Sequence, residues 1–163
     1  MRDVVAGLVA VGLLLVAASL ATTLQYFRRR RLRARAVEHN RGRIVIAEIP
    51  ADDDLVLVSE DDAAFHYGDK AIPKDGIAAA RVLINGAPIA AVISNRHPGA
   101  ALHPTSFEDH PEGIARDRWD VAVETTGGTV LVECGAIRER VSQELARAIF
   151  DAIKRDVEQR NDA

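Results

Sequence analysis

One segment near the N-terminus constrains this chain more than any other. Residues 4–24 read VVAGLVAVGLLLVAASLATTL and contain no charged side chain. At about 1.5 Å per residue, a helix of this length spans roughly 31 Å, which matches the hydrocarbon thickness of a bilayer. The segment therefore predicts a single transmembrane helix.

Arginines are concentrated on the C-terminal side of the apolar segment. Its N-terminal side carries only Arg2 and the amino group, partly offset by Asp3. The positive-inside rule then predicts a single-pass protein of the inner (cytoplasmic) membrane, with its N-terminus outside and its C-terminal part cytoplasmic. Aromatic and cationic side chains are favoured at the membrane interface. The predicted interface residues are Tyr26, Phe27, Arg28, Arg29, Arg30, Arg31, Arg33 and Arg35.

A cleaved secretory signal is the alternative interpretation, because residues 19–21 (SLA) form an acceptable cleavage site. The apolar segment is longer than the usual signal core of about 7–15 residues. The residues before it carry almost no net positive charge, and the arginines after it oppose translocation. These observations favour a retained anchor. Export would reverse the cytoplasmic assignment.

Charge divides the chain into a basic and an acidic part. We expect an anchor over residues 1–27, a basic juxtamembrane segment over 28–43 and one cytoplasmic domain over 44–163. Residues 28–43 hold eight arginines and one glutamate (+7), whereas residues 44–163 hold 12 basic and 22 acidic side chains (−10). An anionic bilayer surface attracts the first part and repels the second. Because phosphate contacts need a basic face, no nucleic acid is expected as a partner of the domain.

The single cysteine, Cys134, excludes an internal disulfide and agrees with a reducing compartment. It ends a predicted strand, where we expect it to fill space. A catalytic cysteine would need an activating base nearby.

The pattern from Ile44 onward is typical of short antiparallel strands. Acidic residues 60–62 predict a tight turn, and Asn85-Gly86 supplies the two positive φ values of a type I′ hairpin. Apolar residues then recur every three or four positions over about residues 138–159, which predicts an amphipathic helix with Ser142 as a cap. The seven expected strands cover about residues 44–49, 55–59, 63–67, 77–84, 87–94, 119–125 and 129–133.

This order of elements resembles the pleckstrin-homology-like (PH-like) fold of bacterial membrane-attached domains. The resemblance covers residues 44–159 and includes the segments Phe65-His-Tyr-Gly68 and Ile72-Pro73. It implies an α+β domain: a small antiparallel barrel or sandwich of about seven strands, closed by the C-terminal helix. Phosphoinositide-binding members carry basic residues around the first hairpin, where this chain has Asp52–Asp54 and Glu60–Asp62. No phosphoinositide is therefore expected as a ligand. Protein binding, which the PH-like fold also supports, is the remaining expectation.

Three His-Pro pairs recur in the polar segment 95–117, together with Glu108, Asp109 and Glu112. If the segment folds back on itself, the imidazoles can bind Zn²⁺, Ni²⁺ or Cu²⁺, or titrate near neutral pH. Each proline favours an extended histidine, so a plain polar loop is the competing interpretation. His66 is expected to face solvent, and the acidic turns can form a weak Ca²⁺ or Mg²⁺ site. The candidate metal ligands are His97, His103 and His110.

The sequence predicts a non-enzymatic, membrane-anchored adaptor that binds a protein partner at the membrane. It contains no phosphate-binding glycine loop, zinc-protease helix or nucleophile elbow, so no catalytic residue and no cofactor is assigned. Two alternatives stay open: a metal or pH sensor that uses residues 95–117, and an enzyme with an unrecognised site.

Overall fold

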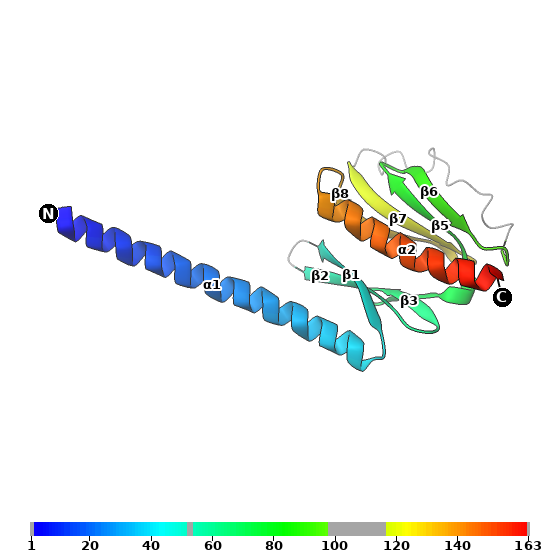
Figure 1. Cartoon of the computed structure of the whole chain (residues 1–163), viewed down its shortest axis with the longest axis horizontal. Coiled ribbons are helices and arrows are strands. Elements are labelled where there is room, and N and C mark those ends of the chain that lie inside the picture. The colour runs from blue at the N-terminus through cyan, green and yellow to red at the C-terminus, as the bar shows by residue number, and fades with distance from the viewer. Residues whose placement is uncertain (1, 52–53, 98–116, 163) are drawn as a thin grey trace. The chain divides into compact units, whose positions relative to one another are not determined.

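The computed structural model describes residues 2–51, 54–97 and 117–162. The chain forms two compact units, Met1–Arg41 and Gly42–Ala163. Figure 1 follows the chain from the long N-terminal helix α1 to the C-terminal helix α2. The two units are described separately below.

The first unit is one continuous helix, α1 (Arg2–Asn40, 39 residues). Among the described residues it is the one helix long and apolar enough to cross a membrane. Its apolar side chains from Val11 onward are exposed; Leu14, for example, is 70% exposed. The hydroxyls of Thr22 and Thr23 donate to the carbonyl of Ser19, so these polar groups are satisfied within the helix. The arginines continue the same helix without a break.

The second unit contains two antiparallel sheets of four strands each and the helix α2. The first sheet has the order β1-β2-β3-β4, and the second has the order β6-β5-β7-β8. A short 3₁₀ helix, Lys74–Gly76, joins the sheets. The elements are β1 (Ile44–Ala51), β2 (Asp54–Glu60), β3 (Ala64–Tyr67), β4 (Lys70–Pro73), β5 (Ile77–Ile84), β6 (Ala87–Ile93), β7 (Arg118–Thr125), β8 (Gly128–Ala136) and α2 (Arg140–Asp162).

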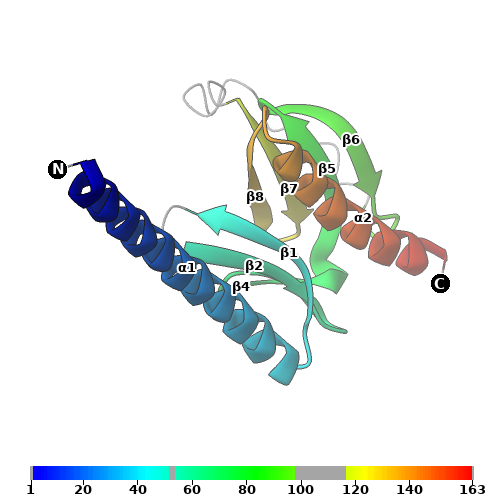
Figure 2. The same ribbon diagram turned by 60° about the vertical axis from the view of Figure 1, so that its left-hand side comes forward.

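The apolar face of α2 forms the centre of the core. Figures 1 and 2 show α2 running along the sheet of β5–β8, with β1 of the other sheet beside it. Ile149, Ile153 and Val157 on this face are at most 2% exposed. They meet a layer of valines from β7 and β8, because every second residue of a strand faces the same side. The valines of this layer are Val121, Val123, Val130 and Val132.

The end of α2 is hydrogen-bonded to the 3₁₀ helix and to the end of β6. The Arg160 guanidinium donates to the carbonyl of Lys74, beside the first sheet. The Asn161 amide donates to the carbonyl of Ile93 (3.1 Å), and its oxygen accepts from the N–H of Asn95 (2.8 Å), at the end of β6. The last turn of α2 therefore holds the β6 end and the 3₁₀ helix in place.

The fold confirms the α+β class and corrects several details. The described residues contain eight strands rather than the expected seven, and the additional one is the four-residue strand β4 (Lys70–Pro73). Both sheets are open, and they do not close into a barrel. The Asn85-Gly86 hairpin is confirmed, with φ values of 52° and 80°. The helix begins at Arg140, and the buried Ser142 lies inside it rather than at its cap.

The position of Ser142 predicts that Gly135 cannot be replaced by a larger residue without loss of stability. Gly135 has φ = 114°, and a Cβ there would lie 2.6 Å from Oγ of Ser142. We expect Gly135→Ala to lower the free energy of unfolding by about 1–3 kcal/mol, because strain and a steric clash combine. Urea unfolding followed by the fluorescence of Trp119 measures this change. A variant as stable as the parent would contradict the geometry.

Candidate functional site

A surface groove of about 260 Å³ lies between the β2–β3 turn and the second half of α2. Its walls combine an exposed apolar side chain, Ile44, with charged groups of both signs. It begins at Gly42, the first residue of the second unit. The lining residues are Gly42, Ile44, Glu60, Asp61, Asp62, Lys74, Ala152, Arg155, Asp156 and Gln159.

Lys74 connects the two walls of the groove. Its Nζ lies 3.7 Å from a carboxylate oxygen of Glu60 and 3.6 Å from one of Asp156. The same Nζ stands 4.9 Å from the centre of the Phe65 ring, and the Lys74 side chain is only 14% exposed. Asp156 also pairs with Arg160. Glu60, Lys74, Asp156 and Arg160 therefore form one connected network of charges at the groove.

Asp61 in the groove makes hydrogen bonds with both carboxylate oxygens. Its Oδ1 accepts from the N–H groups of Ala63 (2.9 Å) and Ala64 (2.8 Å), and its Oδ2 lies 2.7 Å from Nε2 of His66. The His66 hydrogen bond and then these backbone bonds lower the pKa of Asp61 from 3.8 to about 2. The expected acidic turn is thus confirmed. The expectation that His66 faces solvent was wrong: the residue is 7% exposed, because Asp61 gives its ring a partner.

This geometry predicts a specific loss of stability in acid. The folded pKa of Asp61, about 2, lies below its unfolded value of 3.8, so its contribution is present above about pH 4. That contribution should disappear as the pH falls from about 4 to about 2. Urea unfolding of the parent and of Asp61→Asn across this range measures the difference. We expect the two stabilities to converge at the acid end; a gap that is independent of pH would contradict the prediction.

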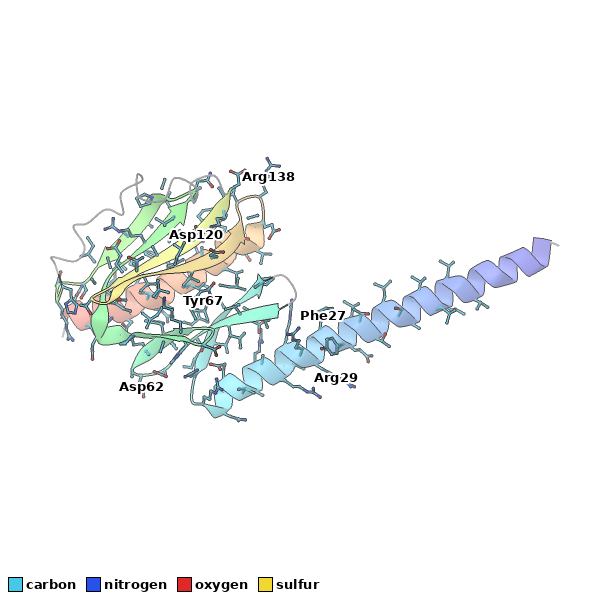
Figure 3. The ribbon with its side chains drawn as sticks, turned by 180° about the vertical axis from the view of Figure 1, so that it is seen from behind. Phe27, Arg29, Asp62, Tyr67, Asp120 and Arg138 are labelled. Carbon is cyan, nitrogen blue, oxygen red and sulfur yellow. The ribbon has the colours of Figure 1, made fainter. Side chains whose placement is uncertain are left out.

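A second polar surface lies on the outer face of the β5–β8 sheet. Arg81 Nε donates to Glu124 (2.7 Å). Arg118 donates from Nε to Asp120 (2.9 Å) and lies 2.8 Å from Glu133. Figure 3 shows Asp120 on this sheet, Tyr67 in the interior and Asp62 at the surface. Each of these two arginines is paired with a carboxylate that is at most 8% exposed, Glu124 or Asp120.

Of the three candidate metal ligands, only His97 lies within the described residues. The ring Nε2 of His97 donates to the carbonyl of Asp75 (2.8 Å). His103 and His110, like Glu108, Asp109 and Glu112, lie outside the described residues, as do Asp52 and Asp53. Within the described ranges, no group of three His, Cys, Asp or Glu side chains is arranged to hold a metal ion. The metal site at residues 95–117 therefore stays a prediction.

Cys134 is confirmed as a space-filling core residue. It is 1% exposed in β8, and burial raises the pKa of its thiol to about 12. We expect no reaction with a thiol reagent such as DTNB while the domain is folded, since the thiolate is the reactive form. One thiol per chain should react in concentrated guanidinium chloride. Rapid labelling of the folded chain would contradict this packing.

The predicted interface residues all lie on α1. Tyr26 and Phe27 are 63% and 50% exposed, and their rings meet edge to face with centroids 5.8 Å apart. Arg28, Arg29, Arg30 and Arg31 follow directly in the same helix, and then Arg33 and Arg35. The structure thus gives one helical rod with an apolar part, an aromatic pair and a cationic part in succession.

No protein-family model, curated protein or solved structure matches this chain. The strongest local features are the helical rod and the groove. Sequence patterns could identify only the first, since the groove unites residues from four separate segments.

Proposed function

We propose that this chain is a single-pass membrane protein whose N-terminal helix anchors an interaction domain, residues 42–163, at the cytoplasmic surface. The observation that carries the proposal is the composition of α1. Exposed apolar side chains occupy the helix from Val11 to Leu24 and arginines follow. One residue, Arg41, separates the end of the helix from the second folded unit. A long exposed apolar helix needs a lipid environment, and the arginine bias supports a cytoplasmic C-terminus.

A PH-like assignment of the domain is supported by the order of its elements. Antiparallel hairpins fill two sheets, and a single amphipathic helix follows them. The eight strands and the open sheets differ from the seven-stranded barrel or sandwich that the resemblance implies. Around the β2–β3 turn, Glu60, Asp61 and Asp62 occupy the region where headgroup-binding members carry cations. This departure supports a protein partner rather than a phosphoinositide.

The groove is the surface that we propose for this partner. It combines the 68%-exposed Ile44 with the exposed carboxylate of Asp62 and the exposed amide of Gln159. Protein interfaces typically surround an apolar contact with polar groups that fix orientation. The acids Glu60, Asp61, Asp62 and Asp156 outnumber the bases Lys74 and Arg155, which favours a partner segment with an apolar and a basic side chain.

Photocrosslinking in intact membranes tests this function. A photoreactive residue replaces Asp62 or Gln159 in the groove, and a matched control replaces Thr129, which is exposed on β8. We expect the same discrete protein adduct from both groove positions and none from Thr129. The further change Ile44→Asp should reduce the adduct. Absence of an adduct at both groove positions, or equal adducts at all three, would overturn the proposal.

A further inference from the structure

The helix α1 continues unbroken from its apolar part through Arg28–Arg35, so helical geometry gives the direction in which each of these arginines points. At about 100° per residue, Arg28 to Arg31 point in four directions around the helix, and Arg33 and Arg35 add to two of these sides. No side of the helix is without an arginine within this stretch. We name the set Arg28, Arg29, Arg30, Arg31, Arg33 and Arg35 the arginine collar.

The collar stands at a defined depth. Its residues follow Leu24 by 4 to 11 positions, which is about 6–17 Å along the helix. The headgroup layer beyond the hydrocarbon core is about 5–8 Å thick, and the Debye length is about 8 Å at physiological ionic strength. The exposed rings of Tyr26 and Phe27 lie between the apolar part and the collar, where aromatic groups favour the interface. Arg28 and Arg29 therefore lie within the headgroup layer, and the remaining collar arginines follow within about one Debye length of it.

The collar segment itself contains no acidic residue. Residues 25–37 contain no Asp or Glu, and the first carboxylate, Glu38, pairs with Arg41 at 3.0 Å. The side chains of Arg28, Arg29, Arg31 and Arg33 are exposed. A guanidinium presents a planar fork of N–H donors that matches phosphate oxygens.

We infer that the arginine collar is a binding site for anionic phospholipid headgroups, which surround the helix as a shell of phosphates. The inference rests on the proposed membrane placement and adds the lipid class. Phosphatidylcholine, whose headgroup carries a compensating cation, should bind less well than phosphatidylglycerol. The selectivity comes from the helix and is independent of the groove.

The test uses the full chain in lipid nanodiscs made from equal amounts of phosphatidylcholine and phosphatidylglycerol. Electron spin resonance of spin-labelled lipids measures how strongly each lipid associates with the protein. We expect phosphatidylglycerol to associate at least about fivefold more strongly than phosphatidylcholine, and high salt to reduce the preference. Substituting glutamine for all six collar arginines should remove it, whereas lysine substitutions should retain most of it.

A matched control removes six exposed cations from the domain instead. Its preference should equal that of the parent, because the inference assigns the selectivity to the collar. Equal association of both lipids with the parent, an unchanged preference in the glutamine variant, or an equal loss in the control would overturn the inference. So would competition by inorganic phosphate at constant ionic strength. A chain that fails to enter nanodiscs would refute the anchor itself. The control positions are Lys70, Arg96, Arg138, Arg140, Arg147 and Lys154.

Discussion

Replacing Ile153 with alanine should lower the free energy of unfolding of residues 42–163 by about 2–5 kcal/mol. Ile153 is 2% exposed and belongs to the central face of α2, which contacts β1, β5, β7 and β8. The substitution removes buried methyl groups and leaves a cavity that the two sheets cannot close. Urea unfolding of the full chain in detergent measures the change through Trp119, the only tryptophan.

Val141→Ala is the matched control for this prediction. Val141 lies on the same helix but is 59% exposed, so we expect a change within about 0.5 kcal/mol. Equal effects at both positions would mean that α2 does not pack as described. A large effect of Ile153→Ala alone would establish that the helix is an integral part of the domain core.

Relocating the arginines of α1 should reverse the orientation of the chain in the membrane. Substituting glutamine for the six collar arginines and Asp3→Arg moves the excess positive charge to the N-terminal side. Flanking Lys and Arg residues set the orientation of a single span, so most chains should insert with the domain outside. A C-terminal reporter that is active only outside the cytoplasm measures the inversion: silent in the parent and active in the variant.

The control for orientation keeps the collar and replaces the exposed domain cations Arg138, Arg140 and Arg147 with glutamine. The reporter should stay silent, because charges far from the span contribute little. An active reporter in the parent would overturn the cytoplasmic placement directly. The interaction domain would then face the other side of the membrane, and its partner would have to be sought there.

Local signals in the sequence were sufficient for the elements that depend on them. The apolar run identified the first part of α1, Asn85-Gly86 fixed one hairpin, and the three-to-four spacing of apolar residues located α2 within three residues at its C-terminal end. In each case the physical cause lies within one short segment. Cys134 was also interpreted correctly, because a cysteine in an apolar strand needs no distant partner.

Features that depend on distant contacts could not be predicted. β4 has only four residues, too few to show the alternation of apolar and polar side chains that marks a strand. It is stabilised by its pairing with β3. The burial of His66 follows from the carboxylate of Asp61, five residues away in a turn. The groove requires that β2, the 3₁₀ helix and α2 meet, and Lys74 gives no sign in the sequence that it bridges Glu60 and Asp156.

The Asn161 amide also bears on how the chain avoids aggregation. β6 is an edge strand without a single charge, and such strands readily recruit further strands from other molecules. Pro88 has no N–H to offer, and the register shift leaves Ile89 unpaired with β5. At the other end, Asn161 bonds the carbonyl of Ile93 and the N–H of Asn95, as a neighbouring strand would. Removing residues 161–163 would remove these two hydrogen bonds, so we expect the truncated chain to self-associate more readily through the edge of β6.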